Sequence, residues 1–164
     1  MAFDPEAFMS QTVEQPFETE RTLVPEGEYR MAVDDFTSDA VQQVDFTYKK
    51  GERAGQPGSF LKFNCPIVIL DDKVAHDLEL DKVVVMWQIN LDVDDNGQLV
   101  WGKNKNISLG QLRAACGQNQ AGPWGIPNLR GSKPFMGKVI HRKIKRDDGT
   151  SYSVADISRV MPIR

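Results

Sequence analysis

The chain has 164 residues, of which 40% are hydrophobic and 26% are charged, and its formal net charge is −3. This length suits one domain with a core of its own, and the composition is ordinary for a globular protein. The longest apolar runs, 67–70 and 83–87, are far shorter than a membrane span. No basic segment followed by an apolar stretch opens the chain, so we expect neither a membrane helix nor a secretory leader.

The charge is divided unevenly along the chain. Residues 1–100 carry 8 Lys and Arg against 20 Asp and Glu, a net charge of −12, whereas residues 101–164 carry 12 against 3, a net charge of +9. Such a division favours a surface that binds a polyanion, and nucleic acid is the partner that we expect first. The alternative is that the basic part packs on the acidic part of its own chain or of a neighbouring copy.

Residues 1–26 are predicted to form an extended acidic arm. Its apolar residues follow neither a helical nor a strand period; they are Phe3, Phe8, Val13, Phe17 and Leu23. A segment of this kind is either flexible or laid across a partner surface with its aromatic side chains as anchors. The second case suits assembly into an oligomer. The remaining residues, 27–164, are predicted to form a single domain.

Five strands are expected in this domain, at 28–36, 60–70, 82–93, 134–146 and 151–157. Apolar and polar residues alternate in the first strand, as in a half-buried strand. Residues 83–87 are apolar on both faces, which is typical of a central strand. Residues 41–49 also alternate and are expected to form an additional hairpin arm with the first strand. Residues 50–59 carry three glycines and a proline, which predicts a loop.

One helix is expected between the third and fourth strands. Ser108 is a suitable N-cap, Gln111 completes a capping box, and Gly117 is placed to end the helix. The order strand, strand, strand, helix, strand, strand is that of an OB-fold. The predicted fold class is therefore mostly β: a five-stranded OB-like Greek-key barrel with one short helix between strands three and four, preceded by the extended N-terminal arm.

Basic residues stand where this fold binds oligonucleotides. OB-folds hold them on the face of strands two and three, flanked by the one–two and four–five loops. The candidate phosphate contacts in these two loops are Lys49, Lys50 and Arg53 in the first and Lys143, Lys145 and Arg146 in the second. His141, Lys143 and Lys145 share one face of the fourth strand by the two-residue period. A phosphate backbone relieves the repulsion within such a row.

Aromatic residues are the second requirement for binding single-stranded nucleic acid, because its unpaired bases stack on aromatic rings. Tyr48, Trp101 and Trp124 adjoin lysines or Gly-rich loops and are the expected platforms. Lys103 and Lys105 follow Trp101, and this run either contacts phosphates or is an ordinary polar connection into the helix. Lys138, at the beginning of the basic strand, completes the candidate set.

Catalysis and metal binding find little support. His76 and His141 do not pair with Cys or His at the spacing of a zinc site. The pairs at 34–35 and 71–72 are aspartates that a two-metal nuclease would need, but they stand at predicted strand ends, where Asp marks turns. We expect no enzyme activity, no cofactor and no metal. The two cysteines share no motif and are expected to be buried thiols in a reducing compartment.

Six short motifs stand out along the chain: Phe3-Asp-Pro, Val24-Pro-Glu-Gly-Glu-Tyr29, Phe60-Leu-Lys-Phe63, Ala114-Ala-Cys-Gly117, Leu129-Arg-Gly131 and Phe135-Met-Gly-Lys138. Together they resemble phage-encoded single-stranded DNA-binding proteins of the OB type. The resemblance spans most of residues 3–158. It implies that the protein coats single-stranded DNA, without sequence preference, during replication or recombination in the cytoplasm of an infected bacterial host.

The chain departs from this family at its C-terminus. Many such proteins end in an acidic tail that recruits partners, whereas this chain ends Arg159-Val-Met-Pro-Ile-Arg164. The acidic N-terminal arm is then the candidate for contacts with replication or recombination proteins.

A structural role is the competing interpretation. Phage genomes also encode small β-rich proteins that decorate capsids, and an acidic arm beside a basic β domain suits head-to-tail assembly. The protein would then be a virion component. A homo-oligomer is expected in both interpretations.

Overall fold

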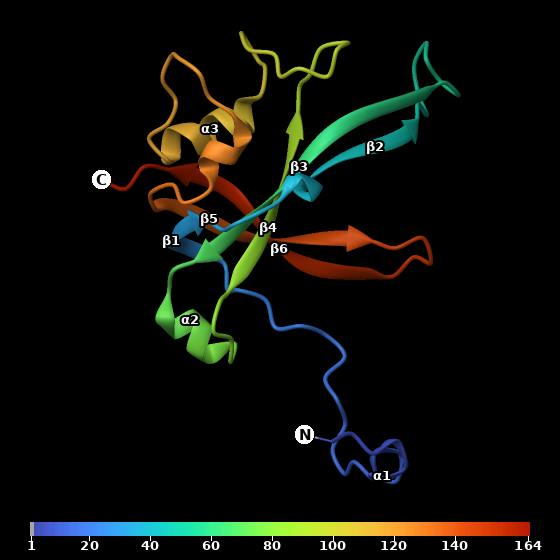
Figure 1. Cartoon of the computed structure of the whole chain (residues 1–164). Helices are drawn as coiled ribbons and strands as arrows, with labels where there is room; N and C mark the ends of the chain where they lie inside the picture. Colours follow the sequence, from blue (N-terminus) through green and yellow to red (C-terminus); the bar gives the residue numbers. More distant parts are fainter. Residues whose placement is uncertain (1) are drawn as a thin grey trace.

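The computed structural model describes residues 2–164 and is mostly β (Figure 1). Six strands are found in this range: β1 (Gly27–Val33), β2 (Val41–Thr47), β3 (Pro57–Ile69), β4 (Val84–Leu91), β5 (Phe135–Lys145) and β6 (Ser151–Met161). The helices are α1 (Pro5–Met9), α2 (Asp72–Asp77) and α3 (Ile107–Ala115), with 3-10 turns η1 (Ser38–Ala40) and η2 (Ile126–Leu129). Of the helices in residues 2–164, none has both the length and the apolar character needed to cross a bilayer.

β3 organises the antiparallel sheet. The strands are ordered β2-β3-β1-β5-β6, and β4 also pairs with β3. β2 pairs with the first half of β3, β1 with its last residues, and β4 with most of its length. β4 and β6 contact each other as well. The expectation of a mostly β chain is confirmed, with six strands in place of five.

The additional strand is β2, and its pairing differs from the prediction. It was expected to form a hairpin with the first strand, but it pairs with β3, from Val41 opposite Phe63 to Thr47 opposite Pro57. The glycine-rich loop brings these two strands together, because the Tyr48 amide donates to the Gln56 carbonyl (2.9 Å) and the Tyr48 carbonyl accepts from the Gly55 amide (2.7 Å). β1 cannot take β2, since β3 and β5 already occupy its two edges.

The core is formed by the inward side chains of β1, β3, β4, β5 and β6 together with those of α3. Its fully buried large side chains include Met31, Phe63, Ile67, Leu112 and Phe135. β4 departs from the prediction of a strand buried on both faces: its residues alternate, and every second one is exposed. The 54% exposure of Met86 shows that the outward face is open to solvent.

α3 begins two residues earlier than predicted, at Ile107, and without the capping box of Ser108 and Gln111. The residue before the helix is Asn106, which is left-handed (φ 50°) and does not cap the helix with its side chain. Its side chain instead accepts from the Asp92 amide (2.9 Å) and donates to the Val100 carbonyl (2.7 Å). These bonds tie the helix to the end of β4, so a long-range contact replaces the local cap. Gly117, with φ 72°, follows the helix end as predicted.

The arm is attached to the sheet near residue 24 and then runs away from it (Figure 1). Val24 is buried, and its carbonyl accepts from His141 on β5. The distal part contains α1, which the sequence did not predict. Asp4 caps this single turn by accepting from the amides of Glu6 (3.1 Å) and Ala7 (3.4 Å). α1 lies at the opposite end of the molecule from α3 (Figure 1).

Candidate nucleic-acid interface

β2, β3 and β4 turn one common face to solvent, which we call the outer face. Strand pairing places Gln42, Lys62 and Asn90 side by side across it. The amide of Asn64 donates to Gln42 (3.3 Å) along the same surface. The side chains that form the outer face are Gln42, Val44 and Phe46 of β2, Phe60, Lys62 and Asn64 of β3, and Val84, Met86, Gln88 and Asn90 of β4.

Three aromatic rings form a strip at one end of the outer face. The centroid of Phe46 lies 4.8 Å from that of Tyr48 and 6.0 Å from that of Phe60. Gly58 stands opposite Phe46 and makes this arrangement possible, because a Cβ there would lie 2.7 Å from the Phe46 ring and 2.8 Å from the Tyr48 ring. Of these three rings the sequence prediction included only Tyr48, although Phe46 lies two residues before it and is therefore expected on the same face of the strand.

The β2–β3 connection continues this strip with positive charge. Lys49, Lys50 and Arg53 are all exposed there, as expected for a phosphate-binding loop. The Arg53 guanidinium carbon lies 5.7 Å from the centroid of Tyr48, and Nη1 donates to the Tyr48 hydroxyl (3.4 Å). Cation and ring are thereby held together at the end of the aromatic strip.

The β5–β6 hairpin supplies a second basic group. Lys143, Lys145 and Arg146 are exposed, and the guanidinium carbon of Arg146 lies 4.5 Å from the ring centroid of Tyr152. Both this hairpin and the β2–β3 hairpin project from the same side of the body (Figure 1).

A cleft of about 810 Å³ joins this hairpin to β4. Met86 of β4 lines it together with Lys143, Arg146 and Tyr152 of the hairpin. Residues 19–24 of the arm form another part of its wall. The structure thus brings Lys143 and Arg146 of the second hairpin to the edge of the outer face at β4.

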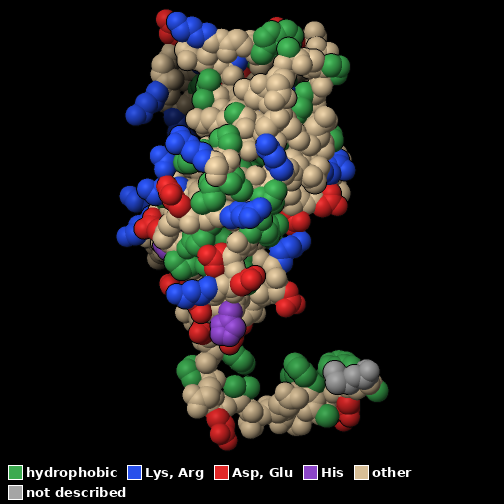
Figure 2. Space-filling view, turned by 90° about the vertical axis from the view of Figure 1, so that its left-hand side faces the viewer, with side chains coloured by type: hydrophobic (Ala, Val, Ile, Leu, Met, Phe, Trp, Pro, Cys, Tyr) green, Lys and Arg blue, Asp and Glu red, His purple; other side chains and the backbone are tan. Residues whose placement is uncertain are grey.

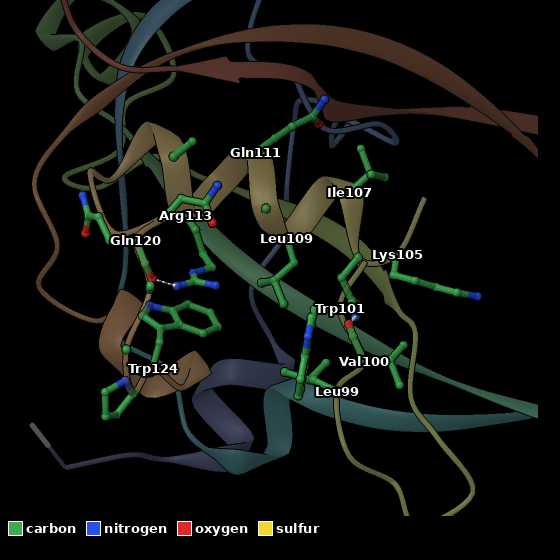
Figure 3. Close-up of a pocket in the computed structure, with 17 residues that line it drawn as sticks. Leu99, Val100, Trp101, Lys105, Ile107, Leu109, Gln111, Arg113, Gln120 and Trp124 are labelled. Atoms are coloured by element: carbon green, nitrogen blue, oxygen red, sulfur yellow. Dashed lines mark hydrogen bonds between the residues drawn. The ribbon is translucent and has the colours of Figure 1, made fainter. Parts of the chain in front are cut away.

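Three other predicted residues, Trp101, Lys105 and Trp124, lie apart from the hairpins. They line a second cleft of about 1090 Å³ beside α3, which we call the α3 cleft (Figure 3). Trp101 is 90% exposed. Trp124 is partly buried: the Arg113 guanidinium covers its ring at 4.2 Å, and its Nε1 donates to Gln118 (2.9 Å). Arg113 therefore competes with any base that would stack on this ring.

The remaining candidates are dispersed. Lys103 is exposed on the loop that follows Trp101. Lys138 lies between Glu28 and Arg159 in the pairing of β1, β5 and β6, beside the ion pair that those two residues form (2.8 Å). The ring of His141 is hydrogen-bonded to the Val24 carbonyl (2.7 Å). It is therefore not available to contact a phosphate in the way that Lys143 and Lys145 on the same strand are.

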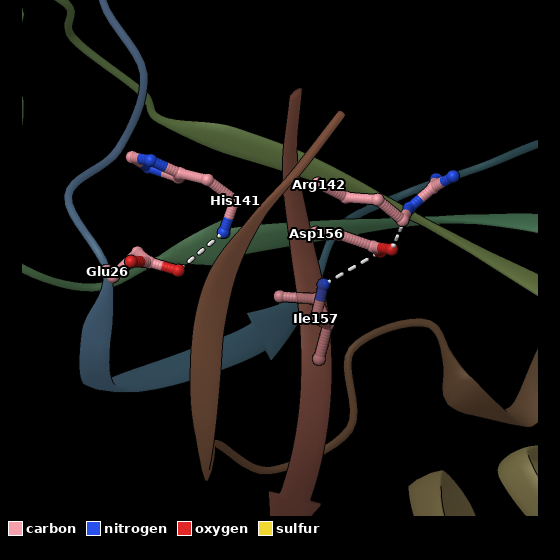
Figure 4. A network of polar contacts seen from close by, with 5 residues as sticks. All are labelled: Glu26, His141, Arg142, Asp156 and Ile157. Atoms are coloured by element: carbon pink, nitrogen blue, oxygen red, sulfur yellow. Dashed lines mark hydrogen bonds and ion pairs between the residues drawn. The ribbon is translucent and has the colours of Figure 1, made fainter. Parts of the chain in front are cut away.

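Positive charge is not confined to one surface. Figure 2 shows Lys and Arg side chains scattered among Asp and Glu over the side of the body at the left of Figure 1, with the N-terminal segment protruding below. Some cations are neutralised within the fold: Arg142 donates to Asp156 (3.0 Å), which in turn accepts from the Ile157 amide (2.8 Å; Figure 4). Net charge alone therefore does not locate a binding surface.

The titratable groups with shifted pKa values have structural causes. Burial raises the pKa of both thiols, Cys65 and Cys116, so both are protonated at neutral pH. The hydrogen bond from Lys82 to Asp34 (2.8 Å) lowers the pKa of that carboxyl. Within residues 2–164 no three His, Cys, Asp or Glu side chains are grouped so that they could hold a metal ion.

Comparisons with models of known protein families, with curated proteins and with solved structures find no match for this chain. The functional interpretation rests on the outer face, its two basic hairpins and the two clefts.

Proposed function

We propose that this protein binds single-stranded DNA, without catalysis and without sequence preference, on the outer face between the two basic hairpins. The observation that carries the proposal is the aromatic strip of Phe46, Tyr48 and Phe60, which continues into exposed cations at one end and into Lys62 on the same face. An exposed row of rings beside cations is the combination by which proteins hold unpaired nucleotides.

The strand connections support an OB-like barrel. β1 pairs with both β3 and β5, β4 lies on β3, β6 lies on β5, and β4 contacts β6. α3 stands between β4 and β5 in the chain, and β2 is then an insertion between the first two barrel strands. In that arrangement the outer face corresponds to the face of strands two and three, where OB-folds bind oligonucleotides.

Each part of the surface has a distinct task in this proposal. The hairpin cations neutralise phosphates, which supplies most of the affinity and makes it depend on salt. The rings of the strip are tilted by 71° and 50° to their neighbours, so bases stack on them individually and not as one continuous column. Exposed amides such as Gln88 and Asn90 can accept from or donate to any base edge, which suits binding without sequence preference.

Fluorescence anisotropy with labelled oligo-dT tests the proposal. The titration is made at low and at high salt, with unlabelled duplex DNA as competitor. We expect tight binding at low salt, a steep loss at high salt and little competition by duplex, because paired bases cannot reach the rings. Absence of binding at low salt, or equal competition by duplex, would contradict the proposal.

A further inference from the structure

The tip of the N-terminal arm carries an exposed apolar cluster. Phe3 and Phe8 pack on each other with ring centroids 5.7 Å apart, yet they remain 68% and 55% exposed. Met9 beside them is 80% exposed, and no residue of α1 is buried. A helix of one turn is marginal alone in water, so docking on another surface would stabilise it. This cluster has the character of an anchor for such a surface.

The α3 cleft offers an apolar surface of matching kind. Trp101, Ile107 and Pro123 line it, and Ile107 is 55% exposed although it begins a helix of the domain (Figure 3). Gly110 lies in the same wall, and a Cβ placed on it would meet no atom within 4 Å. The helix backbone is therefore open to close approach by another chain. Exposed apolar surfaces of this kind commonly mark sites at which a protein binds a partner.

The two surfaces are complementary in charge. Residues 2–20 contain five acidic and no basic side chains. The described lining of the α3 cleft contains Lys105 and Arg113 and no Asp or Glu, and Lys103 is exposed on the same loop. Opposite charges of this kind steer association and set its orientation.

We propose that the α3 cleft of one copy receives α1 of a second copy. Phe3 and Phe8 pack against Trp101 and Ile107, and the acidic side chains of the arm lie beside Lys105. The donor is a second copy because the arm leaves the sheet at Val24 and carries α1 to the opposite end of the molecule from α3 (Figure 1). A contact between unlike surfaces is head-to-tail, and it builds a ring where the rotation between copies closes and an open chain where it does not. The proposal is independent of DNA binding.

Two variants of the full chain separate the donor from the acceptor. Phe3→Ser with Phe8→Ser removes the anchor and touches only exposed side chains. Gly110→Glu fills the cleft with an acidic side chain; it costs the fold little, because the added atoms meet open space and Glu is a better helix former than Gly. His76→Glu is the charge-matched control, since His76 is 91% exposed on α2.

Sedimentation velocity without DNA, at low salt and over a series of concentrations, gives the readout. We expect the wild type and the His76→Glu control to form growing assemblies, and each of the two variants to associate at least about tenfold more weakly. An equimolar mixture of the two variants should restore one-to-one pairs, because one supplies an intact arm and the other an intact cleft. Docking of the arm within its own chain predicts no pairs in the mixture.

Three results would overturn the proposal: a wild type that stays monomeric, a Gly110→Glu variant that assembles like the wild type, or a mixture without pairs. A Gly110→Glu variant that assembles like the wild type but has lost affinity for oligo-dT would, in addition, make the cleft a nucleic-acid site.

Discussion

The imidazole of His141 donates from Nε2 to the main-chain carbonyl of Val24 across 2.7 Å. The main-chain amide of His141 also donates to the carboxylate of Glu26 (2.8 Å; Figure 4). These bonds join the middle of β5 to the segment that precedes β1. They fix the point at which the arm leaves the sheet, and the residues just before it form part of the wall of the cleft between β4 and the β5–β6 hairpin.

Replacing His141 by Ala should loosen this attachment without weakening DNA binding. We expect faster amide hydrogen exchange at residues 24–28 and a loss of about 1 kcal/mol in the free energy of unfolding, the usual worth of one hydrogen bond. Affinity for oligo-dT should stay within about twofold of the wild type. Lower affinity with unchanged exchange would instead place the imidazole at the DNA, as the sequence predicted.

Charge reversal on the β5–β6 hairpin and on the loop before α3 should have unequal effects. The pairs Lys143→Glu with Lys145→Glu, and Lys103→Glu with Lys105→Glu, change the net charge equally. We expect the first pair to weaken oligo-dT binding about a hundredfold at low salt and to lower the slope of log K against log salt by about 1.4, since each phosphate contact with a single strand contributes about 0.7. The second pair should change affinity less than about threefold. Equal losses in anisotropy titrations would show that only total charge matters.

Gly137 is required by the close approach of β1 and β5. A Cβ at this position would lie 2.5 Å from Sδ of the buried Met31 and 3.2 Å from the Arg159 carbonyl oxygen. Gly137→Ala should therefore lower the free energy of unfolding by about 1–3 kcal/mol, as expected for overpacking. Gly110→Ala is the control, because its Cβ meets open space and Ala favours the helix. Urea denaturation measures both, and a Gly137→Ala variant as stable as the wild type would contradict this packing.

The ion pair between Asp34 and Lys82 predicts a pH-dependent contribution to stability. Because the pKa of Asp34 is lower in the folded state than its ordinary value of 3.8, the contribution is complete at pH well above 3.8 and is lost as the pH falls through the folded-state pKa. Lys82 is more than half exposed, so the pair is worth about 0.5 kcal/mol.

Asp34→Asn should accordingly be less stable than the wild type at pH 7, and the difference should vanish in acid. Thermal unfolding across the pH series measures it, with Asp81→Asn, a nearby exposed carboxylate, as the control. A difference between Asp34→Asn and the wild type that grows on acidification would have the wrong sign for this pair.

The strands could be predicted from the sequence because their signals are local. Alternation at Tyr29, Met31 and Val33 marked β1, and Asp148-Gly149 marked the turn before β6. Pairing was not predictable in the same way. The alternation of β2 says which side chains share a face but not which strand lies beside it, and the apolar run of β4 did not reveal that Met86 faces solvent.

The same distinction between local signals and long-range contacts applies to the candidate site. The two basic loops could be located because each interrupts a predicted pair of strands. The separation of Trp101 and Trp124 from these loops depends on where α3 packs, which local pattern does not encode. The start of α3 at Ile107 depends likewise on a contact between Asn106 and Asp92 across 14 residues. Long-range contacts of this kind determine these positions, and local sequence patterns do not reveal them.

The most direct measurement is oligo-dT affinity of the double variant Phe46→Ala with Phe60→Ala, with Trp101→Ala as the control and circular dichroism to verify folding. Each lost stacking surface is worth about 1–3 kcal/mol. We therefore predict that the double variant binds at least about thirtyfold more weakly and that Trp101→Ala binds like the wild type. Unchanged affinity in the folded double variant, with a large loss in Trp101→Ala, would contradict the outer face as the binding surface.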